Sequence, residues 1–288
     1  MMLTKETTKM TFTTYLGDCI DVMRSIPDKS IDMILTDPPY GVLNKDNPDA
    51  KWDAIIPFKD MWREYTRITK PESAIILFGQ GMFSADLMHS NREMWRYNLI
   101  WEKDRPTGFL NAARMPLRSH EDIMVFYDRL PTYNPQMTPC KPSERVHPIG
   151  NGPHTDRNRQ YGNFSRVHNP TIRDEKFPKS VIHVKKEHEC KGDDHPTQKP
   201  VELCEWLIAT YTNKGDVVLD SCMGSGTTGV ACANLGRDFI GIEANPKYYE
   251  MANIRLRESG AEIREVQGDE VLTRPPRQPK LSMFGFSD

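Results

Sequence analysis

A carboxylate, two prolines and a tyrosine follow directly on a short apolar run. Asp37, Pro38, Pro39 and Tyr40 come straight after residues 31–35, which have the length and content of a buried strand. Successive prolines cannot continue a strand ladder, so the chain must leave the sheet rigidly here. An ordinary strand-terminating turn is the alternative, but chance would supply this string in only about one chain in a thousand. We expect Asp37 and Tyr40 to project at the carboxyl edge of a sheet, where open α/β folds bind ligands.

A second candidate site combines two glycines with two acidic residues at strand ends. Residues 217–219 are expected to form a strand, which Asp220, Gly224 and Gly226 follow, and Glu243 ends the next expected strand. Glycines at a strand-to-helix turn let the backbone approach a ligand closely. A carboxylate about 20 residues further on can accept hydrogen bonds from a ribose diol. The pattern therefore indicates a ligand that carries a ribose.

Two familiar classes of nucleotide-binding protein fit this pattern less well. The third glycine of the dinucleotide fingerprint does not fall where it should, which disfavours a dinucleotide-binding oxidoreductase. The sequence also holds no Gly-Lys-Ser/Thr string, which a nucleotide triphosphatase would use to cradle phosphates.

The pattern of apolar runs predicts the elements that position both strings. Short runs of strand length alternate with helical stretches, which indicates an α/β fold with a doubly wound, mostly parallel sheet covered on both faces. The expected strands are 31–35, 74–78, 122–127, 217–219 and 239–242, and the expected helices are 202–212 and 227–235.

Length and composition limit the class of protein. The chain has 288 residues, of which 38% are hydrophobic and 27% charged, enough for one large α/β domain with an insertion. No run approaches the roughly 18 apolar residues of a spanning helix, and the N-terminus lacks a signal peptide. We therefore expect a cytoplasmic protein with reduced cysteines and no membrane contact. The net charge of −2 argues against wholesale wrapping of nucleic acid but permits a local basic face.

A basic, loop-rich stretch interrupts the α/β pattern. Residues 129–199 hold 13 Lys and Arg against 8 Asp and Glu, and hydrophobic periodicity almost vanishes between 131 and 181. Such a stretch is typical of an insertion whose shape is set by contacts rather than by long helices. The expected divisions are a catalytic half (1–128), an insertion (129–194), a cofactor-binding half (195–272) and a flexible tail (273–288).

Together these strings resemble the DNA amino-methyltransferases that use S-adenosylmethionine. The order resembles their permuted beta group, in which the Asp-Pro-Pro-Tyr half precedes the cofactor half. The resemblance covers residues 13–256 around the insertion and includes 16–19 before the first helix, 118–121 before a strand, and 195–200. The chain departs from the family at 221–222, where Ser-Cys replaces the usual Pro-Phe. The resemblance implies a Rossmann-like methyltransferase sheet with a target-recognition insertion. In that sheet the strand before the glycine turn and the strand before Asp37 would be neighbours.

The resemblance also implies a site for S-adenosylmethionine, which would leave as S-adenosylhomocysteine. Asp220 and the following turn would hold the methionine part, Glu243 the ribose hydroxyls and Asp18 the adenine amino group, while the backbone of 197–199 would close the pocket. The implied cofactor-binding residues are Asp18, Cys19, Asp37, Thr197, Gln198, Lys199, Asp220, Cys222, Met223, Gly224, Ser225, Gly226, Thr227, Thr228, Glu243 and Ala244.

The resemblance makes Asp37, Pro38, Pro39 and Tyr40 the catalytic residues. We expect the Asp37 carboxylate and the Pro38 carbonyl to accept hydrogen bonds from the two N–H groups of an exocyclic amine, so that the nitrogen lone pair points at the methyl carbon. Attack is then direct, without a covalent protein intermediate, and positioning alone can contribute about 7–11 kcal/mol. Tyr40 would stack on a base rotated out of the duplex and would face the sulfonium.

The target base is expected to be adenine, methylated at N6. Asp37 at the first motif position resembles the adenine enzymes, whereas cytosine-N4 enzymes more often carry Ser there. Three alternatives stay open: a cytosine-N4 enzyme, an RNA methyltransferase and a non-catalytic DNA-binding module.

Double-stranded DNA is the expected partner. A basic stretch with interleaved aromatics fits target recognition, because arginine can contact guanine edges and lysine phosphates. Arg105 and Arg114 lie in another expected loop on the same side. The candidate DNA-binding residues are Arg105, Arg114, Arg145, Arg157, Arg159, Tyr161, Arg166 and Arg173.

The sequence raises two further partners. One is a second copy of the chain, and the other is a replication sliding clamp, because the tail resembles peptides that dock on such clamps, with Leu281 and Phe284 as anchors. His183, His188, Cys190 and His195 match no regular zinc spacing, so no metal is expected. The resemblance places the protein in the cytoplasm of a bacterium, encoded by the host or by a phage, as in restriction–modification.

Overall fold

The computed structural model describes residues 10–43, 53–140, 174–185 and 198–267. The chain divides into two compact units, one of residues 1–134 with 180–288 and one of residues 135–179. In the smaller unit, β6 (Thr138–Pro139) and β7 (Glu175–Lys176) form a two-stranded antiparallel sheet. The larger unit holds the candidate site.

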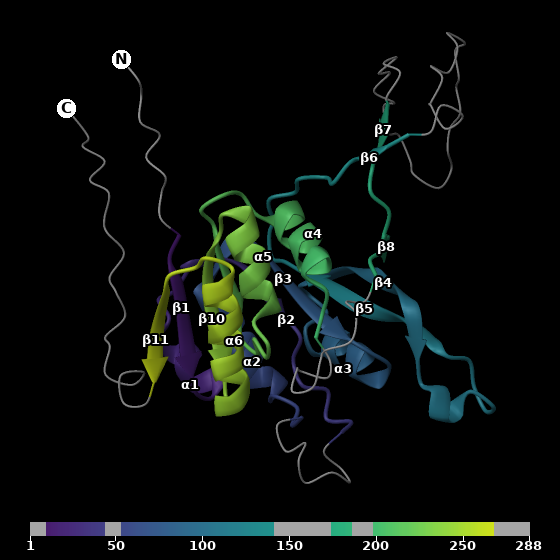
Figure 1. The fold of residues 1–288 in the computed structure, drawn as a ribbon, viewed down its shortest axis with the longest axis horizontal. Helices are drawn as coiled ribbons and strands as arrows, with labels where there is room; N and C mark the ends of the chain where they lie inside the picture. The colour runs from purple at the N-terminus through teal and green to yellow at the C-terminus, as the bar shows by residue number, and fades with distance from the viewer. Residues whose placement is uncertain (1–9, 44–52, 141–173, 186–197, 268–288) are drawn as a thin grey trace. The chain divides into compact units, whose positions relative to one another are not determined.

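Nine strands of the described residues form one sheet in the larger unit, in the order β11-β1-β10-β9-β2-β3-β5-β4-β8 (Figure 1). Neighbouring strands are parallel except on the two sides of β5, which runs antiparallel to β3 and to β4. The predicted doubly wound, mostly parallel sheet is confirmed. The strands are β1 (Phe12–Leu16), β2 (Ile31–Thr36), β3 (Thr69–Gly79), β4 (Trp95–Thr107), β5 (Arg118–Phe126), β8 (Val181–His183), β9 (Val217–Asp220), β10 (Asp238–Glu243) and β11 (Ile263–Gln267).

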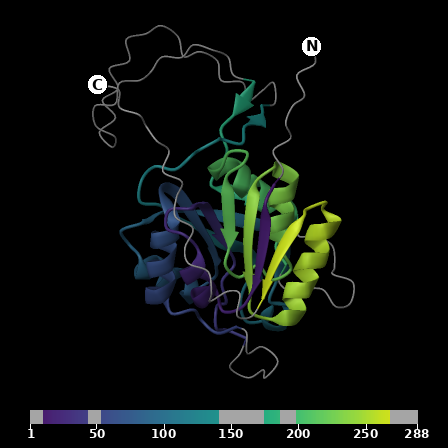
Figure 2. The ribbon, with the colours of Figure 1, turned by 90° about the vertical axis from the view of Figure 1, so that its left-hand side faces the viewer.

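Helices cover both faces of this sheet, because its central strands are apolar on both sides. In β2, Met33 and Leu35 pack into the core beneath α4, α5 and α6, whereas Ile34 packs into the core beneath α1, α2 and α3. Figure 2 shows the two helix groups on opposite sides of the strands. The helices are α1 (Cys19–Ser25), α2 (Phe58–Ile68), α3 (Met82–Ser90), α4 (Val201–Tyr211), α5 (Thr227–Leu235) and α6 (Pro246–Glu258).

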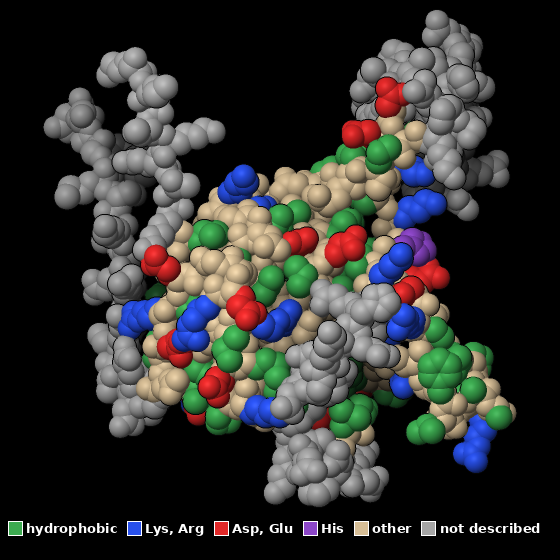
Figure 3. Space-filling model, in the orientation of Figure 1, with side chains coloured by type: hydrophobic (Ala, Val, Ile, Leu, Met, Phe, Trp, Pro, Cys, Tyr) green, Lys and Arg blue, Asp and Glu red, His purple; other side chains and the backbone are tan. Residues whose placement is uncertain are grey.

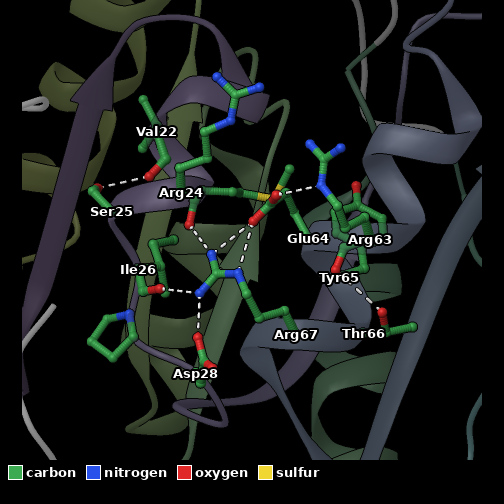
Figure 4. Close-up of polar contacts among 12 residues, drawn as sticks. Val22, Arg24, Ser25, Ile26, Asp28, Arg63, Glu64, Tyr65, Thr66 and Arg67 are labelled. Carbon is green, nitrogen blue, oxygen red and sulfur yellow. Dashed lines mark hydrogen bonds and ion pairs between the residues drawn. The ribbon is translucent and has the colours of Figure 1, made fainter.

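A half-buried arginine fixes the C-terminal end of α1 against α2. Arg67 donates to the carbonyls of Met23 (2.6 Å) and Ile26 (2.8 Å) and to the carboxylates of Asp28 (2.6 Å) and Glu64 (2.9 Å). Figure 4 shows the bonds to Ile26, Asp28 and Glu64. A cation at a helix C-terminus is favourable because the last carbonyls carry partial negative charge. These bonds hold α1 in place, and α1 begins at the candidate site.

The predicted strands and helices are confirmed, with two corrections. Residues 118–121 do not precede a strand but form the first part of β5, and Arg105 lies in β4 rather than in a loop. The outer halves of both strands are exposed and polar, and they are held by pairs such as Thr107 with Arg118. An exposed antiparallel pair carries no apolar run, which is why the sequence pattern missed this part.

Candidate functional site

A cavity of ≈ 550 Å³ opens where β2, β9 and β10 end at their carboxyl edge. It is lined by the segment after β2, the turn after β9, residues just after β1 and β10, and the segment before α4. The strand order places β9 beside β2, as the family resemblance implied. Cavities of about 300–1,000 Å³ are typical of small-molecule sites, so this volume suits a nucleoside-sized ligand.

Most of the expected site residues line this cavity. Gly226 does not, and Thr197 lies outside the described residues. The expected residues in the lining are Asp18, Cys19, Asp37, Pro38, Pro39, Tyr40, Gln198, Lys199, Asp220, Cys222, Met223, Gly224, Ser225, Thr227, Thr228, Glu243 and Ala244.

The glycines of the turn after β9 have different tasks. Gly224 and Gly226 take φ of 49° and 77°, a region that L side chains rarely adopt. A Cβ on Gly226 would lie 3.0 Å from the Cβ of Ala252 in α6. Gly226 therefore allows α5 to begin close to α6, while Gly224 shapes the cavity wall.

Glu243 is held rigidly at the end of β10. Its Oε2 accepts a hydrogen bond from the Gly224 amide (2.9 Å) and its Oε1 one from the Asn245 amide (2.8 Å). Burial raises the pKa of this carboxyl, which the backbone donors partly counteract. With the Ala244 amide as a third backbone donor, the carboxylate still keeps one of its four lone pairs, so it is oriented and able to accept from a ribose hydroxyl.

Asp220 joins the ends of β9 and β2. Its Oδ1 accepts hydrogen bonds from the Thr36 hydroxyl (2.7 Å) and the Cys222 amide (3.1 Å), and its Oδ2 accepts one from the Thr228 hydroxyl (2.6 Å). Burial raises the pKa of Asp220 to about 6, against the effect of these donors. The side chain is therefore a buried acid that titrates near neutral pH.

Ser221 and Cys222, the two residues that depart from the family pattern, contact hydroxyl and thiol groups of neighbouring elements. The Ser221 hydroxyl lies 2.6 Å from the hydroxyl of Tyr65 in α2 and 3.5 Å from that of Thr36. Cys222 lines the cavity, and its thiol interacts with that of Cys19. Sulfur is polarizable and packs as a small hydrophobic group, so this wall keeps an apolar patch without an aromatic ring.

The segment after β2 is fixed by a buried acid that the sequence pattern did not single out. Asp53 accepts hydrogen bonds from the amides of Tyr40 (2.8 Å), Gly41 (3.0 Å) and Leu43 (2.6 Å). The Tyr40 hydroxyl donates to Asp37 Oδ1 (2.6 Å). These bonds set the direction of the Asp37 side chain.

The Tyr40 ring is already stacked on a neighbour. It lies on the Phe83 ring with a centroid distance of 4.8 Å and an interplanar angle of 28°. Burial, followed by the charge of Asp37, raises the pKa of Tyr40 well above its usual value, so the phenol stays protonated and donates. Stacking of Tyr40 on a flipped base stays a prediction.

A buried lysine contacts the Asp37 carboxylate. Lys199 Nζ forms an ion pair with Asp37 Oδ2 and lies 3.3 Å from Glu121 Oε2, while Lys103 Nζ lies 2.7 Å from Glu121 Oε1. Burial alone would lower the pKa of Lys199, but the two carboxylates outweigh it and the pKa is raised. The backbone of 197–199 was expected to close the cofactor pocket, and the Lys199 side chain in addition reaches the Asp37 carboxylate.

The candidate DNA-binding residues are described only in part. Arg105 lies in β4 and Arg114 follows the short helix η2 (Phe109–Asn111), and neither lines the cavity. The others, Arg145, Arg157, Arg159, Tyr161, Arg166 and Arg173, lie outside the described residues, as do Leu281 and Phe284.

The zinc candidates are likewise described only in part. Of the four, the structure describes only His183, which pairs with Glu102. Within the described ranges, no group of three or more His, Cys, Asp and Glu side chains is placed to hold a metal ion. No helix in the same ranges has the length and apolar content needed to cross a bilayer.

Comparison with known proteins agrees with this geometry. The N6/N4 methyltransferase family, described as DNA methylase, matches residues 31–254. The type II methyltransferase M.HinfI of Haemophilus influenzae is 28% identical, over 93% of this chain and 74% of its own length. The type II methyltransferase M.HpaI of Haemophilus parainfluenzae is 28% identical, over 83% of this chain and 72% of its own.

Solved structures share the fold. The M1.HpyAVI–SAM complex superposes with a TM-score of 0.56 and 25% identity, covering 85% of this chain and 99% of its own. The PvuII cytosine-N4-specific DNA methyltransferase gives a TM-score of 0.58 at 15% identity, over 88% and 95%. With the family match spanning both halves of the cavity, this chain belongs to the N6/N4 DNA methylase family.

Proposed function

We propose that this protein transfers a methyl group from S-adenosylmethionine to N6 of an adenine in double-stranded DNA. One observation carries the proposal: Asp37, at the end of β2, and the Gly224 turn, after β9, line the same cavity. The Thr36–Asp220 hydrogen bond of 2.7 Å joins the two strand ends. A methyl donor and an amine held on these two walls would lie side by side.

The cofactor half of the cavity suits S-adenosylmethionine. Asp18, Asp220 and Glu243 supply carboxylates around the glycine turn, an acidic lining that matches a ligand with an ammonium and a sulfonium. Glu243 would accept the ribose hydroxyls, Asp18 the adenine amino group, and Asp220 with its turn the methionine part. When bound, the cofactor supplies an activated methyl group.

The catalytic half would hold the adenine amino group. The Asp37 carboxylate and the Pro38 carbonyl accept hydrogen bonds from its two N–H groups, so the nitrogen lone pair points at the methyl carbon. A nitrogen–carbon bond then forms as the sulfur–carbon bond breaks, and the methylated nitrogen loses a proton to Asp37 or to water. Because placement supplies most of the rate enhancement, the bonds that fix Asp37 matter directly.

Lys199 would act as a positioning residue for Asp37. Its ion pair and the Tyr40 hydroxyl occupy one lone pair on each Asp37 oxygen, which leaves the remaining lone pairs for the amine. The ion pair therefore fixes the direction of the Asp37 carboxylate.

Residues 129–194 would recognise the DNA sequence. Within this range, the residues expected to contact DNA are Arg145, Arg157, Arg159, Tyr161, Arg166 and Arg173. A homodimer and a sliding-clamp contact through the tail stay proposals, and the expected setting is the cytoplasm of a bacterial host.

Methyl-labelled S-adenosylmethionine tests the proposed reaction class. We expect label in duplex DNA and none in an RNA transcript of the same sequence. A cytosine-N4 enzyme would also label duplex DNA, so the modified base must be identified separately. Label in RNA alone would make the protein an RNA methyltransferase, and DNA binding without transfer would make it a binding module.

Glu243→Ala is expected to weaken S-adenosylmethionine binding about 30-fold, because the variant loses a charged acceptor and frees the Gly224 amide. Isothermal titration calorimetry measures this directly. Glu205→Ala removes a half-buried acid on α4 that accepts from Asn234 (2.7 Å) and does not line the cavity, and it is the matched control. Unchanged affinity in the Glu243 variant would contradict the assigned cofactor half.

Cofactor affinity is expected to fall in acid. The pKa of Asp220 is raised to about 6, so the group is mostly charged at pH 7 and mostly neutral at pH 5. A neutral carboxyl attracts a cationic ligand less, and the apparent affinity should drop up to about tenfold over this interval. Asp220→Asn should bind weakly at both pH values, and a variant with the wild-type slope would show that another group titrates.

A further inference from the structure

The hairpin formed by β4 and β5 projects from the sheet and ends in an ordered apolar turn (Figure 1). Residues 108–117, here the hairpin tip, contain η2 and are held by backbone hydrogen bonds such as Asn111 to Gly108 (2.9 Å) and Met115 to Asn111 (3.0 Å). The tip therefore has a defined shape.

The hairpin tip exposes large apolar side chains. Leu110 is 101% exposed, Phe109 68% and Met115 53%, and Figure 3 shows hydrophobic side chains gathered on the projecting part at the lower right. One exposed leucine is ordinary on a protein surface, but three large side chains on one small turn contribute little to folding. An apolar cluster of this kind commonly marks a contact surface.

The charge around the tip indicates the partner. Residues 105–118 contain Arg105, Arg114 and Arg118 and neither Asp nor Glu, although the chain as a whole has a net charge of −2. A cationic rim around apolar side chains fits a duplex, since arginines contact phosphates and apolar residues wedge between base steps.

The hairpin tip begins where the candidate active site ends. Thr107 and Arg118, the last paired residues of the hairpin stem, line the main cavity. Arg118 donates to Gln80 (2.9 Å), and Gln80 lines the same cavity. These contacts fix the hairpin stem at the rim of the space that would receive the base.

We propose that Phe109 and Leu110 enter the duplex at the position vacated by the flipped adenine. This inference rests on the proposed DNA methylation. Removing a base from the stack costs a few kcal/mol, and an apolar side chain placed in the gap covers the exposed faces of the neighbouring bases. The hairpin tip then stabilises the extruded state, and the three arginines hold the backbone on either side.

The test compares two DNA substrates that contain the recognised sequence, once sequencing of methylated DNA has identified it. In one the target adenine is paired with thymine, and in the other it faces an abasic site, which makes flipping easier. Phe109→Ala/Leu110→Ala should lower kcat/KM about 30-fold on the paired substrate. On the abasic substrate its kcat/KM should return to within about threefold of wild type.

Ile254→Ala is the matched control, since it removes an exposed apolar side chain outside the hairpin. It should behave as wild type on both substrates. The proposal would be overturned if the Phe109→Ala/Leu110→Ala variant lost kcat/KM equally on both substrates or lost it on neither. A changed oligomeric state of that variant would also overturn it. A wild-type protein that methylates neither duplex would instead remove the proposed function.

Discussion

Asp37→Ala is expected to lower kcat for methyl transfer about a thousandfold while S-adenosylmethionine affinity stays within about threefold of wild type. The variant keeps the cavity but loses the acceptor that turns the amine lone pair toward the methyl group. A thousandfold corresponds to roughly 4 kcal/mol of the activation barrier. Single-turnover transfer to duplex DNA, with calorimetry for the cofactor, separates the two quantities.

Asp37→Ala is expected to fold. Lys199 keeps Glu121 at 3.3 Å as a second partner, so the lysine is not left unpaired. Asp32→Ala serves as the control, because Asp32 also pairs with a lysine but does not line the cavity. Turnover of Asp37→Ala close to that of wild type would refute the mechanism.

Lys199→Met should lower kcat about a hundredfold and reduce the free energy of unfolding by up to about 3 kcal/mol. The variant fills the same space but leaves two neighbouring carboxylates with one cation fewer. Without this cation the Asp37 carboxylate loses the partner of its Oδ2 and can turn away from the amine. We therefore expect the loss to appear in kcat, while the KM for S-adenosylmethionine stays within about threefold of wild type.

The conservative variant distinguishes positioning from a merely structural role. Lys199→Arg retains the charge and should recover kcat to within about tenfold of wild type. Lys70→Met removes another lysine paired to a carboxylate and should leave kcat and KM unchanged. A Lys199→Met variant that is destabilised but has wild-type kcat would confine the residue to stability.

The two halves of the site were predictable because each is a local string. Asp37 to Tyr40 and the turn around Gly224 stand at strand ends that the apolar runs identify, and parallel strands bring such ends to one edge. The pairing of β9 with β2 came from the family resemblance and is confirmed.

The contacts between distant side chains could not be predicted. Lys199 and Asp37 are 162 residues apart, and nothing in either string shows that the lysine side chain crosses to the carboxylate. Asp53 fixes the segment after β2 from a stretch without any pattern. Gly226 was expected in the cofactor site, but it does not line the cavity and lies against Ala252 of α6.

The missed strands have physical reasons too. β1 and β11 are short, and β4 mixes apolar with charged residues, so none forms a clear apolar run. β1 and β11 lie at one side of the sheet, and β4 lies near the other with its outer half exposed. In each case pairing with a neighbouring strand decides the structure.

Mass spectrometry of nucleosides shows whether Asp37 directs the methyl group to adenine N6. Duplex DNA is incubated with the protein and S-adenosylmethionine carrying an isotopically labelled methyl group, and is then digested. The account predicts labelled N6-methyldeoxyadenosine with the wild-type protein and none with Asp37→Ala. Labelled N4-methyldeoxycytidine in its place, or N6-methyldeoxyadenosine formed equally by both proteins, would contradict it.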